Sequence, residues 1–144
     1  MLVRLAIDPG RYAGWALSRD GIVVACGLNV YPNRIRVFAG VDEVVCERPQ
    51  HYPNMSTKQA NDLITLALRA GGLCECACPG VPVTWVLPHA WKCSVPKDMH
   101  NVRVLKRLEE SEKVLVRESA CASLVNNVID AVGLSLWASK RYTP

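Results

Sequence analysis

The chain has 144 residues, 50% of them hydrophobic, and a formal net charge of +4. This length and composition predict one globular domain over residues 1–144. They exclude a membrane-spanning protein, because no apolar run reaches the length of about 18 residues that a span requires. Arg4 and Asp8 also interrupt the apolar segment at the N-terminus, which argues against a secretory signal. We therefore expect a cytoplasmic protein whose mild positive charge is compatible with a polyanionic partner.

Short aliphatic and β-branched runs, bounded by turn residues, predict five strands. They cover residues 2–7, 13–17, 22–30, 44–47 and 81–87. Tight turns, such as Asp20-Gly21, make the first three strands antiparallel neighbours. Helical crossovers would place the last two strands parallel to the first, with the first and fourth side by side. The predicted fold class is therefore α/β, with a mixed five-stranded sheet flanked by helices.

Apolar residues at helical spacing predict three helices. The first begins after the N-cap Ser56 and reaches Gly71-Gly72, and residues 73–78 either continue it or link it to the next strand. The other two helices cover residues 99–112 and 117–141.

Seven cysteines are too many, and odd in number, for the disulfide framework of a small secreted domain. Cys74, Cys76 and Cys78 form a C-x-C-x-C run, with His89 and Cys93 further along the chain. Zinc sites usually contain C-x-x-C pairs, so structural zinc is the less favoured interpretation. Alternate residues of a strand share one face, and the three thiols would then line a core in the reduced state.

Three carboxylates stand where the hydrophobic pattern stops or is interrupted. Asp8 and Glu47 end the first and fourth strands, so they should meet at one end of the sheet, where α/β folds place ligands. Asp130 lies within the apolar stripe of the last helix, and Asn127 projects from the same side three residues earlier. Gly133 would let this helix press closely against a strand.

Three converging acids cannot all stay ionised without a cation. Hard oxygen ligands favour Mg²⁺, with Mn²⁺ as a substitute, over zinc. Two such ions activate water and stabilise the leaving oxygen in phosphodiester cleavage. We therefore expect a metal ion, rather than a basic side chain, as the partner of Asp8. Each acid also has a plainer interpretation: a turn at Asp8, a surface ion pair between Glu47 and Arg48, and a solvated helix position for Asp130.

These segments resemble the motifs of RuvC-type Holliday-junction resolvases within the RNase H-like superfamily, above all the compact phage-type members. Ile7-Asp8-Pro9-Gly10, followed by Gly14, resembles the first motif of the family. Val45–Gln50 resembles the second motif, in which an acid ends the fourth strand. The last resembles Asn127–Ala131, in which Asp-Ala follows an acid or histidine on the final helix. The resemblance covers nearly the whole chain and implies an RNase H-like fold. The compact size suggests, by analogy, a phage, viral or organellar setting.

The resemblance implies that Asp8, Glu47 and Asp130 bind the catalytic metal ions. Asn127 stands where many relatives place a carboxylate or histidine. Its amide oxygen can ligate a metal but supplies no charge and cannot act as a base. Glu118, nine residues upstream, is a poor geometric substitute unless the helix begins after it.

The resemblance also implies a partner, because the family cleaves four-way DNA junctions as a homodimer. The helix from Ser56 to Ala70 would supply the twofold interface. Residues expected to contact DNA include three that follow Glu47 in the chain, of which His51 and Tyr52 could stack on an unpaired base, and five basic side chains that could bind phosphates. These residues are Gln50, His51, Tyr52, Lys92, Lys97, Arg103, Lys106 and Arg107. A solvated helix face for the basic set, and loop packing for Tyr52, remain open alternatives.

The leading hypothesis is a metal-dependent, structure-specific endonuclease that resolves branched DNA. A YqgF-type RNA-processing nuclease is disfavoured by Pro9 and by the spacing of Glu47 and Gln50. A nucleic-acid-binding module that has lost catalysis is the alternative from another class, since Asn127 replaces an expected acid.

Overall fold

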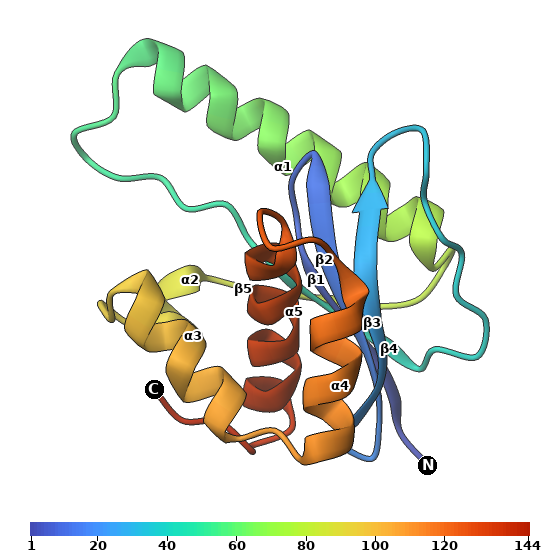
Figure 1. The fold of residues 1–144 in the computed structure, drawn as a ribbon. Helices are drawn as coiled ribbons and strands as arrows, with labels where there is room; N and C mark the ends of the chain where they lie inside the picture. The colour runs from blue at the N-terminus through green and yellow to red at the C-terminus, as the bar shows by residue number, and fades with distance from the viewer.

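A five-stranded mixed sheet forms the centre of the computed structural model, which describes residues 1–144 (Figure 1). Its strands, in chain order, are β1 (Val3–Asp8), β2 (Tyr12–Arg19), β3 (Ile22–Val30), β4 (Glu43–Glu47) and β5 (Val83–Val86). Across the sheet the order is β3-β2-β1-β4-β5, with β1, β2 and β3 antiparallel and β4 and β5 parallel to β1. The predicted fold class is confirmed, including the placement of β4 beside β1.

Five helices cover the two faces of this sheet, and none is both long and apolar enough to cross a membrane. They are α1 (Thr57–Ala77), α2 (Pro88–Lys92), α3 (Lys97–Lys106), α4 (Glu110–Ser119) and α5 (Val125–Ala138). Successive strand residues point to opposite faces. Ala6 packs in one apolar cluster with α3, α4 and α5, whereas Leu5 and Ile7 pack in another with the last turns of α1. The molecule therefore has three layers.

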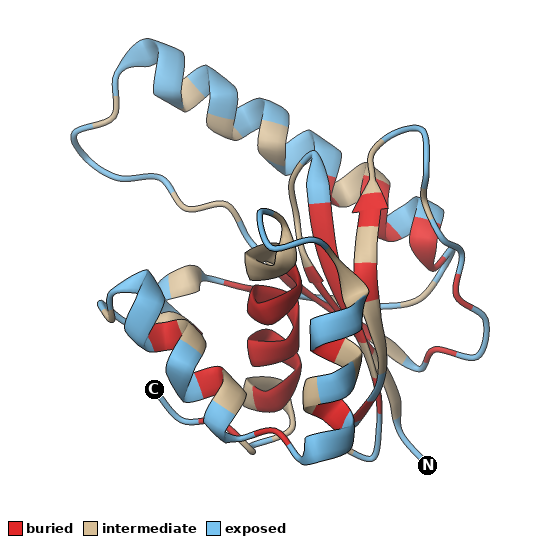
Figure 2. Ribbon diagram, in the orientation of Figure 1, coloured by how far each residue is buried: buried red, intermediate tan, exposed pale blue.

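Helix α5 is the most deeply buried element, with nine consecutive buried residues, Val128–Leu136 (Figure 2). Its first turn lies directly on β2, where Gly14 makes the contact possible. A Cβ at Gly14 would stand 1.8 Å from the carbonyl oxygen of Asn127, closer than any two such atoms can approach. The position of α5, and hence of Asp130, therefore depends on this glycine.

Gly133 has a different role from the one predicted. A Cβ at this position would meet Trp91 and Val104, each at 2.9 Å. Gly133 thus allows α2 and α3 to approach α5, and the prediction that it presses the helix against a strand is wrong.

Helix α1 is longer than its glycines suggested. The predicted N-cap is confirmed: Ser56 Oγ accepts from the Gln59 backbone N–H at 3.2 Å, and Gln59 Oε1 accepts from the Ser56 N–H at 2.9 Å. The helix passes through Gly71-Gly72 because the turns beyond them bury Leu73 and Ala77 against the sheet, and this packing outweighs the low helix propensity of glycine.

The C-x-C-x-C run belongs to these last helical turns, so its thiols follow a helical period. Cys74 and Cys78, four residues apart, are buried, whereas Cys76 is exposed. The interpretation that all three share one face of a strand is wrong. Cys46, on β4, packs in the same apolar cluster, and all seven cysteines are free thiols.

The two predicted C-terminal helices are three in the structure, because two breaks interrupt the pattern. Glu109 caps α4: the Glu112 carboxylate accepts from the Glu109 N–H at 2.8 Å, in a capping box made by two acids. Glu112 is fully buried and also accepts from Arg141 through both carboxylate oxygens, at 2.7 and 2.8 Å. Since α5 begins only at Val125, Glu118 lies on α4 rather than on the helix that carries Asp130.

Candidate active site

The three predicted acids come from three elements that meet at one edge of the sheet. Asp8 and Glu47 are the last residues of the parallel neighbours β1 and β4, whose register pairs Ile7 with Cys46. Asp130 enters from α5, which packs across β1 and β2. Desolvation by the surrounding protein raises the pKa of Asp8 well above its ordinary value, and the charges of Asp130 and Glu47 raise it further. The three carboxylates therefore interact electrostatically.

A basic side chain that sequence analysis assigned to phosphate binding lies among these acids. Lys92 Nζ stands 2.9 Å from Glu47 Oε2 and 3.5 Å from Asp130 Oδ2. Burial alone would lower the pKa of Lys92, but the carboxylates of Asp130, Glu47 and Asp8 raise it above its ordinary value. The side chain is therefore an ammonium at neutral pH. Lys92 is thus a basic partner of Glu47 and Asp130, whereas the prediction that a metal ion is the partner of Asp8 stays a prediction.

Two further residues near the acids were missed from the sequence. Trp91, fully buried at the end of α2, donates from Nε1 to Glu47 Oε2 at 2.9 Å. His100 of α3 is 2% exposed, and its Nδ1 lies 3.2 Å from the Tyr142 hydroxyl. The available signal was the spacing of His100 and Val104, which are four residues apart and form the buried face of α3.

The Nε2 atom of His100 faces the acid site. It lies 3.8 Å from Asp130 Oδ1, beyond hydrogen-bond distance, and has no hydrogen-bond partner. Burial, together with the charge of Lys92, lowers the pKa of His100 to about 4. A neutral imidazole therefore stands beside Asp130 at physiological pH.

Asn127 occupies the first turn of α5, three residues before Asp130, and is partly buried. Its backbone carbonyl packs onto Gly14. The neighbouring Asn126, rather than Asn127, is fixed by a side-chain hydrogen bond, from Asn101 Nδ2 to Asn126 Oδ1 at 2.9 Å.

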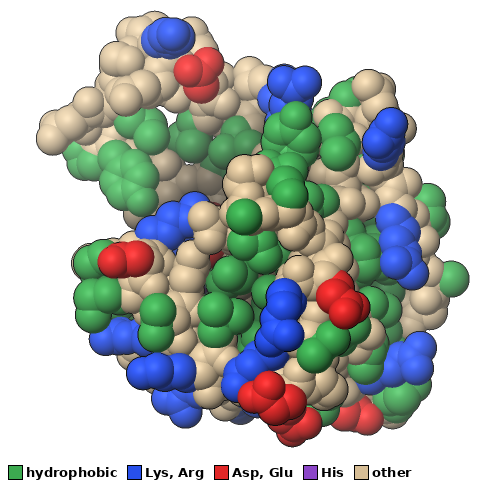
Figure 3. Space-filling model, in the orientation of Figure 1, with side chains coloured by type: hydrophobic (Ala, Val, Ile, Leu, Met, Phe, Trp, Pro, Cys, Tyr) green, Lys and Arg blue, Asp and Glu red, His purple; other side chains and the backbone are tan.

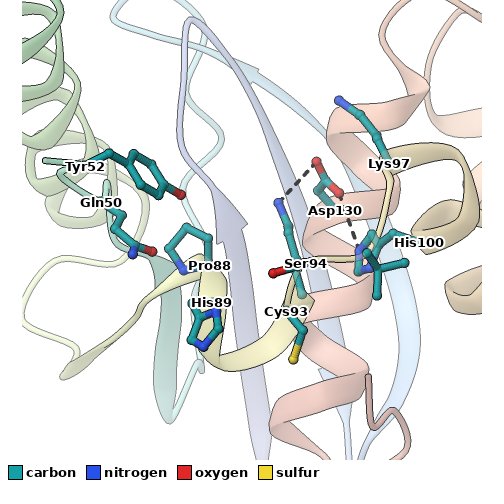
Figure 4. Close-up of a pocket in the computed structure, with 11 residues that line it drawn as sticks. Gln50, Tyr52, Pro88, His89, Cys93, Ser94, Lys97, His100 and Asp130 are labelled. Carbon is teal, nitrogen blue, oxygen red and sulfur yellow. Dashed lines mark ion pairs between the residues drawn. The ribbon is translucent and has the colours of Figure 1, made fainter. Parts of the chain in front are cut away.

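A cleft of about 430 Å³ is lined by one of the three acids, Asp130 (Figure 4). Gln50 and Tyr52 form one wall, and Lys97, His100 and Asp130 face them from the other side. The Gln50 side-chain oxygen is buried without a hydrogen-bond partner. The cleft therefore combines one acid, two lysines and unsatisfied polar atoms, as a site for a charged ligand does.

The predicted DNA-binding residues divide between this cleft and a second one. Gln50, Tyr52, Lys92 and Lys97 line the acid cleft, whereas His51 is exposed outside it. The remaining basic residues line a cleft of about 490 Å³ at the C-terminal end of α3, together with Tyr142, Thr143 and Pro144. Those residues are Arg103, Lys106 and Arg107. Lys and Arg side chains gather on this part of the surface in Figure 3.

The acid site has the donor chemistry of a hard divalent cation, because carboxylate oxygens from three elements converge on it. As the side chains stand, no three His, Cys, Asp or Glu residues are grouped closely enough to hold a metal ion. The Lys92 ammonium instead lies between Glu47 and Asp130. Three carboxylates are suitable ligands for Mg²⁺. In this structure, however, Glu47 and Asp130 are placed to bind the Lys92 ammonium between them.

Comparison with solved structures shows a similar fold at low sequence identity. The structure titled "T. thermophilus RuvC in complex with Holliday junction substrate" is 16% identical, with coverage of 94% of this chain and 91% of that chain and a TM-score of 0.56. A second, titled "Thermus thermophilus RuvC structure", is 16% identical, with coverage of 94% and 92% and a TM-score of 0.43. No protein-family model and no curated protein matches the sequence. The first likeness shows that this chain has the RNase H-like fold of a RuvC structure.

Proposed function

We propose that this chain is a metal-dependent, structure-specific endodeoxyribonuclease that resolves four-way or other branched DNA junctions by paired phosphodiester hydrolysis. The observation that carries the proposal is the convergence of Asp8, Glu47 and Asp130 at one edge of an RNase H-like sheet, beside a cleft that contains lysines. A structure with a similar fold is a RuvC in complex with a Holliday junction substrate, which supports the choice of substrate.

Asp8, Glu47 and Asp130 would hold Mg²⁺, or Mn²⁺ in its place, with Asn127 able to add an amide oxygen. A divalent cation supplies an activated water and neutralises the charge that develops on the phosphate oxygens. The chain's own contribution is orientation. Trp91 Nε1 fixes Glu47, and buried His100 stands beside Asp130.

The cleft walls suit a nucleic-acid substrate. Lys97 is exposed beside the acids and has no carboxylate within ion-pair distance, so its ammonium is free for a backbone phosphate. Tyr52, on the opposite wall, is 52% exposed and presents an aromatic ring on which an unpaired base can stack. The basic cleft formed by Arg103, Lys106 and Arg107 would extend the phosphate contacts along α3.

Paired cutting requires two sites, and α1 offers a surface through which two copies can associate. None of its residues from 57 to 69 is buried, and Ile64 and Leu68 are 59% and 73% exposed. A shallow cleft between Ala67 and Trp85 continues this apolar surface onto the edge strand β5. These features support the proposal of a homodimer that pairs through α1.

A nucleic-acid-binding module without catalysis is the second candidate. Two observations favour it: Asn127 stands at the expected fourth acid, and Lys92 already pairs with two of the three carboxylates. Junction binding that persists without any cleavage would identify such a module.

The test is cleavage of a synthetic four-way junction and of a linear duplex with the same sequence, each in Mg²⁺, Mn²⁺ or EDTA. We expect symmetric cuts in the junction only, dependent on the divalent ion. Asp8→Asn should reduce the rate by at least about 100-fold while junction binding is retained, because it removes one ligand charge. Glu118→Gln, an exposed carboxylate on α4, is the matched control and should cleave normally.

Equal cutting of both substrates would overturn the structure specificity. An absence of cutting with either ion would overturn the nuclease proposal, and full activity of Asp8→Asn would remove Asp8 from the site.

A further inference from the structure

Lys92 lines the acid cleft, but its ammonium is bound by two of the acids. Its ammonium reaches Glu47 Oε2 at 2.9 Å and Asp130 Oδ2 at 3.5 Å, and only 23% of its side chain is exposed. Nζ also lies 4.7 Å from the centre of the Trp91 ring, a cation–π distance. Lys97 lines the same cleft but is exposed and makes no ion pair. Lys92 is therefore bound in ion pairs, whereas the Lys97 ammonium is free.

We propose that Lys92 is an internal counter-ion that closes the acid site in the metal-free protein and leaves it when a divalent cation binds. The inference rests on the proposed function insofar as it concerns the same metal site, and it assigns to Lys92 a role that phosphate binding alone does not explain.

Lys92 and a bound metal ion would compete for the same oxygen atoms. A divalent cation bound at these acids would need lone pairs of Glu47 and Asp130, two of which the Lys92 ammonium already engages. A cation at that position would also repel the ammonium at short range in a partly buried site. The metal ion and the Lys92 ammonium therefore cannot occupy the site together, and binding of the metal requires Lys92 to move.

Lys92 also stabilises the acid site when no metal is bound. It bridges Glu47 and Asp130, and Asp8 ends the strand beside Glu47, so the three carboxylates would repel one another if left without a cation. Lys92 supplies that charge from within the chain and keeps Glu47 and Asp130 in place. Trp91 Nε1 donates to the same Glu47 oxygen, so one hydrogen bond to Glu47 remains after the ammonium departs.

Lys92 lines the acid cleft, and its flexible stem lets the ammonium swing outward without movement of α2. In that position it would join Lys97 on the wall that faces the substrate. Binding of the metal would thereby convert Lys92 from an acid partner into a phosphate partner.

The test compares Lys92→Met, which keeps the length of the stem and removes the charge, with Lys97→Met as the matched control. Mn²⁺ affinity is measured by calorimetry and by electron paramagnetic resonance, and thermal unfolding is followed in EDTA and in saturating Mn²⁺. For Lys92→Met we expect Mn²⁺ to bind about tenfold more tightly or better, because its competitor is gone. In EDTA this variant should also lose roughly 5 °C of Tm, and saturating Mn²⁺ should remove most of that difference. Lys97→Met should change neither quantity by a comparable amount.

Unchanged or weaker Mn²⁺ binding by Lys92→Met would overturn the inference and leave the nuclease proposal standing. An absence of Mn²⁺ binding in both the wild type and Lys92→Met would overturn the metal-dependent function, and the inference with it. If Lys92→Met fails to fold, the ¹⁵N signal of the Lys92 ammonium in the wild type decides: it must shift on titration with Mg²⁺, and an unmoved signal at saturating metal would contradict the displacement.

Discussion

Helices α5 and α1 lie on opposite faces of the same sheet and differ in how much of each is covered. Helix α5 is buried over nine consecutive residues, whereas α1 buries only Ala70, Leu73, Cys74 and Ala77, all in its second half (Figure 2). In Figure 1 the N-terminal end of α1 projects beyond the sheet. The covered helix carries Asp130, whose position depends on packing. The exposed part of α1 buries less surface and contributes less to the stability of the fold, and its exposed leucine and isoleucine suit association.

The largest expected effect breaks the packing of α5. Gly14→Ala would place a Cβ within 1.8 Å of the Asn127 carbonyl oxygen, so α5 must shift away from β2. We expect a loss of about 3 kcal/mol in the free energy of unfolding, the upper end for overpacking, and a loss of cleavage because Asp130 moves with the helix. Urea denaturation measures the first effect.

The control for this variant lies on α1. Gly71→Ala places its Cβ in open space within a helix, and it should stabilise the protein by about 0.5–1 kcal/mol. Equal effects of the two substitutions would contradict the difference between the helices.

A second effect of comparable size concerns Glu112, which ties α4 to the sheet on the α5 side. Its carboxylate accepts from the Val23 N–H at 2.9 Å and from Arg141. Burial would raise the pKa of Glu112, but the hydrogen bonds from Arg141, Glu109 and Val23 outweigh it and hold the pKa below its ordinary value of 4.5. A carboxylate with a lowered folded-state pKa contributes stability above the unfolded-state pKa and loses it as pH falls through the folded-state pKa.

We therefore expect unfolding experiments to show stability falling as pH drops below about 4.5, with Glu112 contributing to the slope. Arg141→Met should cost roughly 3 kcal/mol at pH 7, because it leaves a buried carboxylate without its cation, and should flatten that slope. Lys113→Met, which breaks the exposed pair with Glu110, should have little effect at any pH. If the free energy of unfolding of Arg141→Met depended on pH as it does in the wild type, Glu112 would not contribute to the loss of stability at low pH.

The smallest effect on folding, and the sharpest on assembly, is expected on α1. Leu68→Glu should leave the free energy of unfolding of the monomer nearly unchanged, because Leu68 is 73% exposed, but it should shift a dimer to monomer. Light scattering after size-exclusion chromatography measures the mass. Val114→Glu, at a 40% exposed apolar position on α4, is the matched control and should not alter association. A wild-type protein that is monomeric at high concentration would remove the dimer from the proposal.

The sequence was sufficient to predict the sheet, because each strand is a short apolar run with a clear turn beside it. It also located the three acids, since each interrupts an apolar pattern. The helix boundaries after residue 97 were harder to predict. A capping box made by Glu109 and Glu112, rather than by serine or threonine, gave no recognisable start signal for α4.

The roles of Lys92, Trp91 and His100 could not be predicted, because they depend on how α2 and α3 pack against α5. That packing is set by Gly133, whose missing side chain admits Trp91 and Val104. From sequence alone, Lys92 was one cation among several in a basic segment. Its contact with Glu47 spans 45 positions of the chain and has no local signature.

The most direct test of the account is a crystal structure of the protein soaked in Mn²⁺, read from its anomalous scattering. The account predicts Mn²⁺ bound by Asp8, Glu47 and Asp130, with the Lys92 ammonium withdrawn from Glu47 and Asp130 into the cleft. An anomalous map without a peak at these acids, with Lys92 still between Glu47 and Asp130 at saturating Mn²⁺, would contradict it.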